Sequence, residues 1–264
     1  MSDLRDDPPP FGAVGRGLFG PMPAVRLTAL RLGASIALFA DLGLTYLPHT
    51  ELLNRFGLAA LGLGALAATA LLFKLWPHVA AACCWLSVVG LWEANPLLHN
   101  GGDRLRPLVF LVLIFAVSNT GRAPRWPALV LGVQMACVYF FSGWAKLFDP
   151  YWRDGSALAS ILANPEWSLV AGCTEQVPPV LLQASTWAAL VFELGFPLFM
   201  ILPKLRTPTL LIGAAFHAGT YVTLDVGFFA VWSVVCYLPL LPWELLPVRR
   251  SSPRDATEPS ATMR

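Results

Sequence analysis

Long runs of apolar residues, separated by short polar segments, occupy most of the chain. Several runs approach the roughly 20 residues that an α-helix needs to cross a bilayer. We therefore predict an all-α fold, a polytopic transmembrane bundle of about eight helices. The expected helices span residues 27–47, 58–76, 79–98, 105–118, 126–148, 180–202, 208–224 and 227–246. The fourth is short, so it and the third could form a hairpin that does not fully span.

The composition is typical of an integral membrane protein. Hydrophobic residues make up 56% of the chain and charged residues 13%, whereas soluble domains carry about 25% charged residues. The arginines are spread through the loops, so we expect the lipid bilayer as a partner and no nucleic acid. The five cysteines form no CxxC motif and no cysteine–histidine spacing of a metal site, so no metal is expected.

A single membrane domain, residues 25–248, is predicted between two polar tails. Residues 1–24 are acidic and proline-rich at their start and lack the basic region of a signal peptide. Residues 249–264 are rich in serine, threonine and proline. We predict both tails to be disordered.

The basic residues indicate how the chain crosses the membrane. With both termini in the cytoplasm, most lysines and arginines face the cytoplasm, as the positive-inside rule requires. We therefore expect both termini to be cytoplasmic and the protein to lie in the plasma membrane, the inner membrane of a bacterium. The basic residues left on the outer side are Arg55, Arg104, Arg106, Lys146 and Arg153.

Two ionisable residues lie on the first expected helix, where a charge at the bilayer centre costs about 2.5–3.5 kcal/mol. Arg31 and Asp41 are ten residues apart, a rise of about 15 Å, so they cannot pair with each other. Each must meet another helix or the headgroup region. We interpret both as structural residues.

Lys146 ends the apolar segment YFFSGWAK, residues 139–146. Tyr139, Ser142 and Gly143 precede it by seven, four and three residues, on the same helical face. A small residue beside the lysine leaves room for a ligand, and a lysine in a dry pocket can act as a general base. Alternatively, Lys146 reaches the outer interface and pairs with Asp149, and spacing alone favours this second interpretation.

Glu193 and His217 are the polar residues of two later segments. Pro197 cannot donate a hydrogen bond to the carbonyl of Glu193, so the helix bends there, and the carboxylate faces a cavity or packs against a neighbour. A lone buried histidine is more often a packing residue than a catalyst. The neutral ring of His217 could still orient a ligand or relay a proton.

The segment NPLLHNGGD, residues 95–103, predicts a tight turn between two apolar runs. Asp103 can cap the helix that follows. His99 and Asp103 would then lie on the outer side of the membrane, as Lys146 does.

Taken together, these segments resemble the HTTM family, the membrane domain that vitamin K-dependent gamma-carboxylases share with many bacterial proteins. The resemblance extends from about residue 31 to residue 246, and its third piece is the most specific. The pieces are Arg31…Asp41, NPLLHNGGD at 95–103, Gln134…YFFSGWAK at 139–146…WRDGSAL at 152–158, ELGFP at 193–197, and His217…GFF at 227–229.

The resemblance implies a chemistry for these residues. Lys146 would be the base that deprotonates vitamin K hydroquinone or another quinol. In the carboxylases the oxygenated quinone then removes a proton from a glutamate side chain, to which carbon dioxide adds, a carbon–carbon lyase reaction. His217 and His99 match family histidines and are further catalytic candidates. The candidates for cofactor binding are Tyr139, Gly143, Glu193, Trp152 and Asp103.

The chain departs from the carboxylases after its last expected helix. Those enzymes carry a large, strand-rich C-terminal domain that binds the substrate's propeptide, and this sequence ends shortly after residue 246. One hypothesis is quinol-linked chemistry, with an extracytoplasmic protein or peptide partner supplying the missing domain. The other is a non-catalytic binding, partner or immunity-type membrane protein on the same fold. The residues leave open whether the protein is an enzyme.

Overall fold

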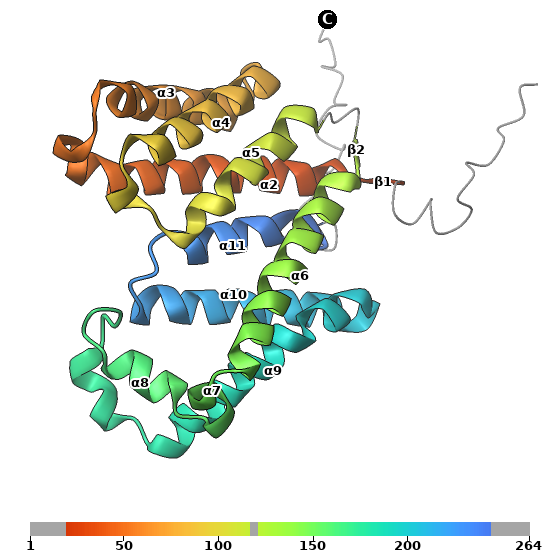
Figure 1. The fold of residues 1–264 in the computed structure, drawn as a ribbon. Helices are drawn as coiled ribbons and strands as arrows, with labels where there is room; N and C mark the ends of the chain where they lie inside the picture. Colours follow the sequence, from red (N-terminus) through yellow and green to blue (C-terminus); the bar gives the residue numbers. More distant parts are fainter. Residues whose placement is uncertain (1–19, 117–120, 244–264) are drawn as a thin grey trace, which may run out of the picture.

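The computed structural model describes residues 20–116 and 121–243 and is almost entirely helical (Figure 1). Its α-helices and strands are β1 (Pro21–Pro23), α2 (Ala24–Asp41), α3 (Arg55–Leu72), α4 (Pro77–Ala94), α5 (Arg106–Phe115), β2 (Arg122–Pro124), α6 (Trp126–Leu147), α7 (Pro150–Asp154), α8 (Ala157–Ala163), α9 (Pro179–Ile201), α10 (Pro203–Thr223) and α11 (Phe229–Tyr237). Short helical turns connect them: η1 (Leu42–Tyr46, a π-helical turn), η2 (Leu47–Leu52), η3 (Pro96–Leu98), η4 (Gly101–Arg104), η5 (Ala171–Gln176) and η6 (Leu238–Leu240).

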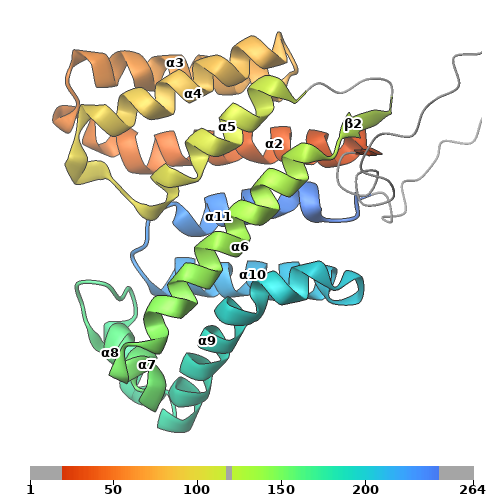
Figure 2. The same cartoon turned by 45° about the vertical axis from the view of Figure 1, so that its right-hand side comes forward.

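The helices form two groups joined by one long oblique helix. In the first group α2, α3, α4 and α5 pack side by side, and α11 lies against α2. In the second group α9 packs against α8 and α10. Helix α6 crosses from the first group to the second and packs along α9, as both views show (Figure 2). Because α11 contacts α2, α6 and α10, it connects the two groups.

Small residues allow the helices of the first group to approach closely. A Cβ atom on Gly64 of α3 would collide with the hydroxyl of Ser87 on α4, and Ser87 Oγ donates a hydrogen bond to the carbonyl of Ala60 at 2.7 Å. Close contact between small residues is the usual way in which helices pack in a membrane. The glycine and alanine positions of α3 therefore determine its packing against α4.

A short two-stranded ribbon joins the beginning of the first helix to the beginning of α6. Strands β1 and β2 pair antiparallel, with Met22 opposite Ala123. The predicted N-terminal tail extends to residue 24, but its residues 21–23 form β1 and Ala24 begins α2. The rest of both predicted tails, apart from Gly20, lies outside the described residues.

Large apolar side chains cover much of the molecular surface. A soluble monomer rarely exposes apolar patches larger than a few hundred Å². Here such residues follow the outward faces of α3, α6 and α9, as expected for helices that face lipid. They include Phe56, Leu63, Leu66, Val133, Phe141, Val180, Val191 and Leu198.

The structure contains fewer membrane-spanning helices than the eight predicted. A helix lies in each predicted segment, but within the described residues four are long and apolar enough to cross a bilayer: Ala24–Leu52, Arg55–Leu72, Trp126–Leu147 and Pro179–Ile201. Helix α5 has 10 residues, a rise of about 15 Å, which is half of the hydrocarbon thickness. Helix α11 has 9 residues. The all-α membrane bundle is confirmed, and the count of eight spans is not supported.

Candidate functional site

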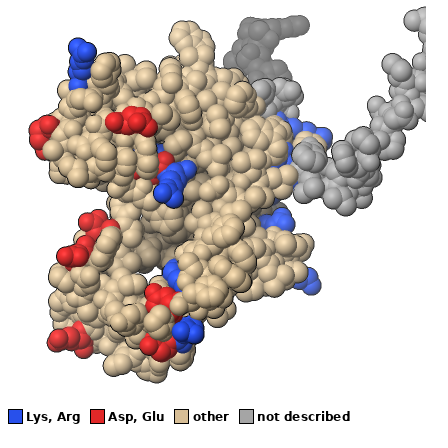
Figure 3. Space-filling view, viewed as in Figure 1, with Lys and Arg blue, Asp and Glu red and all other residues tan. Residues whose placement is uncertain are grey.

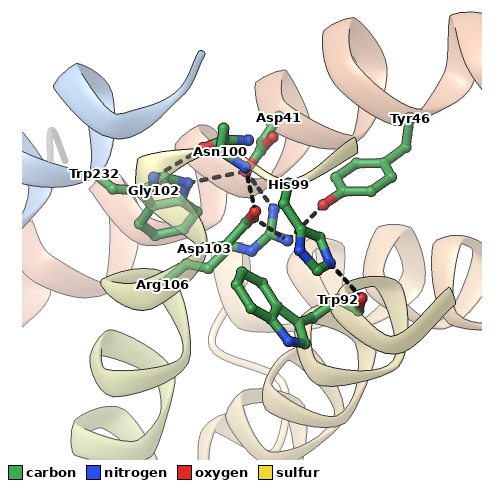
Figure 4. Close-up of polar contacts among 9 residues, drawn as sticks. All are labelled: Asp41, Tyr46, Trp92, His99, Asn100, Gly102, Asp103, Arg106 and Trp232. Atoms are coloured by element: carbon green, nitrogen blue, oxygen red, sulfur yellow. Dashed lines mark hydrogen bonds and ion pairs between the residues drawn. The ribbon is translucent and has the colours of Figure 1, made fainter. Parts of the chain in front are cut away.

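A buried ion cluster joins three helices of the first group (Figure 4). Arg106 at the start of α5 donates to Asp41 Oδ2 at 2.8 Å and pairs with Asp103 Oδ1 at 2.5 Å. Its second terminal nitrogen donates to the hydroxyl of Tyr46 at 2.5 Å, and Trp232 of α11 donates to Asp41 Oδ2 at 3.0 Å. The three charged side chains are 0% exposed. We call these five residues the Arg106 cluster.

The π-helical turn explains why Asp41 and Tyr46 both reach Arg106. In an α-helix, residues five apart point about 140° away from each other around the axis. The i→i+5 bonding of a π-helix brings such residues close to one face. Residues Leu42–Tyr46 form such a turn directly after Asp41. Both side chains therefore point toward α5.

Arg31 also meets another helix. Its guanidinium donates to the carbonyl oxygens of Leu71 and Leu72, the latter at 2.6 Å, at the end of α3. A cation at a helix C-terminus is favourable, because the last carbonyls are unpaired and the helix dipole is negative there. The prediction that Arg31 and Asp41 each meet another helix is confirmed.

The loop between α4 and α5 is rigid and holds His99 in one orientation. Asn100 and Asp103 form a capping box: Asn100 Oδ1 accepts from Gly102 N at 2.8 Å, and Asp103 Oδ2 accepts from Asn100 N at 2.6 Å. The His99 ring stacks on Trp92 at 3.7 Å between centroids, and its Nε2 lies 2.6 Å from the Trp92 carbonyl oxygen. Because a carbonyl oxygen only accepts, Nε2 carries the hydrogen, and Nδ1 of the neutral ring is an acceptor.

Lys146 forms an ion pair with Glu193 across the α6–α9 interface. The Lys146 side chain is 21% exposed and that of Glu193 is 5% exposed. Lys146 Nζ also lies 3.2 Å from Ser142 Oγ and 4.4 Å from the ring centroid of Trp152. The prediction that Lys146 pairs with Asp149 is wrong. The Asp149 carboxylate instead caps α7, where it accepts a hydrogen bond from Tyr151 N at 2.9 Å.

Two glycines allow the elements around Lys146 to approach closely. A Cβ atom on Gly143 would lie 3.0 Å from the Cβ of Glu193, so the missing side chain permits the contact between α6 and α9. Gly155 ends α7 with a φ of 85°, a conformation that favours glycine. Trp187 Nε1 of α9 then donates to the carbonyl of Arg153 at 3.1 Å, which holds α7 and its Trp152 beside Lys146.

The carboxylate of Asp154, in the same turn, accepts two hydrogen bonds. The hydroxyl of Ser156 donates to Asp154 Oδ1 at 2.6 Å and the backbone N–H of Ser156 at 2.8 Å. These hydrogen bonds lower the pKa of the Asp154 carboxyl below its usual value. The WRDGSAL motif at 152–158 is therefore a self-capped turn that positions Trp152.

His217 belongs to a buried chain of hydroxyl and imidazole groups. Tyr139 OH of α6 lies 2.7 Å from His217 Nε2 of α10 and hydrogen-bonds to Tyr237 OH of α11. His217 Nδ1 is buried and has no partner among the described residues. The rings of Phe192 and Phe196 pack against Tyr139. This chain links α6, α10 and α11 and places a ring nitrogen of His217 beside the hydroxyl of Tyr139.

A cleft of about 1400 Å³ opens between the two helix groups, and Figure 3 shows it as a hollow with charged side chains of both signs around it. His99, Asn100 and Arg104 line one wall. Phe229 lines the cleft and packs against His217 with ring centroids 5.7 Å apart. Lys146 and Glu193 are not among the lining residues.

The structure divides the predicted site residues into three places. Lys146, Gly143, Glu193 and Trp152 are together at one end of α6. Tyr139 and His217 form the buried chain, and the seven residues between Tyr139 and Lys146 correspond to about 10 Å along the same face of α6. The loop residues are separate: His99 lines the cleft, and Asp103 belongs to the Arg106 cluster.

Among the residues of these clusters, Arg106, Tyr46, Trp232 and Tyr237 were absent from the sequence-based candidates. Arg106 was expected on the outer side, at the start of the fourth predicted helix, but it is wholly buried, and two carboxylates pair with it. The sequence contained one indication of a buried arginine: Asp41, inside an apolar helix, needs a cationic partner. Tyr237 lies in an apolar segment with no distinguishing neighbour, so its contact with Tyr139 had no signal in the sequence.

The helix lengths, the apolar surface and the buried ion pairs define a helical integral membrane protein. The family model of the HTTM domain matches residues 112–242, and the chain belongs to this family. The matched segment contains Tyr139, Lys146, Glu193 and His217, whereas the segments 31–41 and 95–103 lie outside it. Comparisons with curated proteins and with solved structures gave no match.

Proposed function

We propose that the protein binds a lipid-soluble quinol, such as vitamin K hydroquinone, at the Lys146–Glu193 pair and removes a proton from it. The observation that carries this proposal is Glu193 Oε2, a buried oxygen without a hydrogen-bond partner among the described residues. A buried oxygen of this kind destabilises the fold unless a hydrogen-bond donor reaches it. The donor set of a quinol fits, because each of its hydroxyl groups can donate to a carboxylate.

The pair itself can take up one proton. In the ion pair the shared proton lies on Lys146 Nζ, and Glu193 Oε2 is free to accept another. When the shared proton lies on Glu193 instead, Nζ accepts. The aromatic ring of Trp152 at 4.4 Å stabilises the ammonium form by a cation–π contact. A bound quinol would give one hydroxyl proton to the pair, and in a gamma-carboxylase-like reaction molecular oxygen would be the oxidant of the resulting quinolate.

Helix packing supports the placement of a ligand at this site. Gly143 lets α9 approach α6 so that Glu193 lies beside Lys146, and the exposed fifth of the Lys146 side chain gives access from outside. The apolar faces of α6 and α9 border the site, so a ligand dissolved in the bilayer can reach it laterally.

A second candidate is a non-catalytic binding, partner or immunity-type membrane protein. It is favoured by the ion pair itself, since Lys146 and Glu193 neutralise each other and join α6 to α9. In that case the pair is a structural contact.

The experiment uses purified protein in nanodiscs with reduced vitamin K, oxygen and labelled bicarbonate. Quinone epoxide is quantified for the wild type, Lys146→Ala and Glu193→Gln. Lys204→Ala, at an exposed position of α10, is the matched control, and thermal unfolding establishes that each variant is folded. Epoxide from the wild type and Lys204→Ala only is the expected result. Absence of epoxide from folded wild-type protein would refute the quinol function and leave the non-catalytic role.

We further propose that the protein lies in the plasma membrane with both termini in the cytoplasm. Exposed Lys74 follows α3, exposed Arg122 begins β2 and exposed Lys204 lies at the start of α10. These parts of the elements lie near the end of the bundle where α2 begins (Figure 1), which supports this orientation through the positive-inside rule. The cleft then opens toward the opposite, extracytoplasmic end. An extracytoplasmic protein or peptide that receives the carboxyl group would approach from that side. Cysteine substitution at residues 74 and 104, followed by labelling of intact cells, tests the orientation.

A further inference from the structure

The 1400 Å³ cleft is separate from the Lys146–Glu193 pair and has two walls of opposite charge. Ligand pockets are typically about 300–1,000 Å³, so the cleft can hold a ligand larger than a drug-sized molecule. Its chemistry does not depend on the quinol proposal.

One wall carries Arg104. This residue lies in η4, directly after the Asn100–Asp103 capping box and two residues before the buried Arg106. The backbone of the wall is therefore fixed by the Arg106 cluster. The Arg104 side chain is exposed, lines the cleft, and has no ion-pair or hydrogen-bond partner among the described residues.

The facing wall carries Asp225. Its backbone N–H donates to the carbonyl of Trp167 at 2.9 Å, and Leu169 N donates to the carbonyl of Thr223 at 2.9 Å. These bonds fasten the loop after α8 to the end of α10, so this wall is also rigid. The Asp225 carboxylate is exposed and, within the part of the chain that the structure describes, it is unpaired.

Apolar and aromatic side chains lie between the two charges. Leu44 and Leu97 line the cleft and are 65% and 82% exposed, so apolar surface continues from the cleft to the outside of the bundle. Trp167 and Tyr221 also line it, and such rings favour the level of the headgroups in a bilayer. An occupant that matches this surface has an apolar part and both a negative and a positive group.

We propose that the cleft is a binding site for a zwitterionic phospholipid of the phosphatidylethanolamine type. The phosphate lies against Arg104, because a guanidinium donates two parallel hydrogen bonds to phosphate oxygens. The ammonium group lies against Asp225 and the face of Trp167, which attracts cations. The acyl chains follow Leu44 and Leu97 toward the bilayer. Both walls are held by their own hydrogen bonds, so little ordering is needed on binding.

The experiment measures lipid binding to the full chain in detergent after removal of native lipid. Phosphatidylethanolamine and the anionic phosphatidylglycerol are titrated separately, and thermal unfolding and native mass spectrometry report binding. The variants are Arg104→Gln and Asp225→Asn. Arg55→Gln and Glu175→Gln, at exposed positions that do not line the cleft, are the matched controls.

We expect the wild type to bind phosphatidylethanolamine more tightly than phosphatidylglycerol. Arg104→Gln weakens binding of both lipids, by roughly tenfold for a lost charge-assisted contact. Asp225→Asn weakens binding of phosphatidylethanolamine only, and the two control variants bind as the wild type does.

Two outcomes would overturn the proposal. Equal binding of both lipids, unchanged by Asp225→Asn, would mean that the site does not recognise the ammonium group. Competition by soluble glycerophosphoethanolamine as strong as that by the intact lipid would mean that the apolar walls take no part and that the ligand is a free headgroup. Neither outcome depends on whether the protein oxidises a quinol.

Discussion

Replacement of Arg106 by methionine tests whether the Arg106 cluster holds the first helix group together. The guanidinium pairs with Asp41 at 2.8 Å and with Asp103 at 2.5 Å, and it donates to Tyr46 at 2.5 Å. Methionine fills part of the same volume but donates no hydrogen bond. The variant therefore leaves two wholly buried carboxylates whose remaining donors, Trp232 Nε1 and Asn100 N, are neutral.

The expected loss of stability follows from these uncompensated charges. Removal of one partner of a buried ion pair costs about 3–5 kcal/mol. Because Arg106 serves two carboxylates, we expect the upper part of this range. With a factor of ten for each 1.4 kcal/mol, a loss of about 4–5 kcal/mol raises the unfolding equilibrium constant roughly 700- to 4,000-fold.

The assay is unfolding of the purified protein in mixed micelles with increasing sodium dodecyl sulfate, followed by tryptophan fluorescence. Arg55→Gln is the matched control, since Arg55 is exposed and does not line the cleft, and it should change the free energy of unfolding by less than about 0.5 kcal/mol. The triple variant Arg106→Met/Asp41→Asn/Asp103→Asn removes all three charges and should recover most of the lost stability.

Two results would refute this reasoning. If the free energy of unfolding of Arg106→Met lies within about 1 kcal/mol of the wild-type value, the carboxylates are not charged or not buried. A triple variant no more stable than Arg106→Met would mean that lost packing, and not unpaired charge, is the cause.

Two further predictions concern contacts between helices. Gly143→Val places a side chain against Glu193 and should lower the free energy of unfolding by about 1–3 kcal/mol. The control is Gly62→Ala, at a position where a Cβ meets nothing within 4 Å. It should raise the free energy of unfolding by up to about 1 kcal/mol. The same unfolding assay checks both, and equal effects would contradict the assigned α6–α9 contact. Arg31→Gln weakens the contacts to the end of α3, Leu72 included, and should cost about 1–3 kcal/mol. Arg31→Lys should lose less stability than Arg31→Gln. An equal loss of stability in the lysine variant would argue against a simple contact between a charge and the carbonyl oxygens.

The membrane class was predictable because it depends on local properties. Long apolar runs require helices in a bilayer, since each backbone polar group must be paired within its own segment. Residues 126–148 and 180–202 were predicted as helices and correspond to α6 and α9. The number of spans was not predictable in the same way. Helix α5 starts within one residue of the predicted segment 105–118, but it ends at Phe115 because the backbone is extended at Ala116.

The site was predictable in its residue types and less so in its partners. The local motif placed Tyr139, Gly143 and Lys146 on one helical face, and the structure agrees. Local spacing favoured Asp149 as the partner of Lys146, but that carboxylate is used by its own turn. The actual partner, Glu193, lies 47 residues away, and only the packing of α9 on Gly143 brings it within reach.

The amino-acid sequence by itself determined the helical membrane class, the family, and the residues that cannot remain alone in an apolar environment. Periodicity and hydropathy act between neighbours along the chain, so these features can be read without a fold. The tertiary structure decided which charges meet, since Asp41 and Arg106 are 65 residues apart. It also decided that the two helix groups leave a cleft with Arg104 and Asp225 on opposite walls. These contacts and the cleft depend on the shape of the packed helices and on the desolvation of each charge. Both become defined only when the helices pack together.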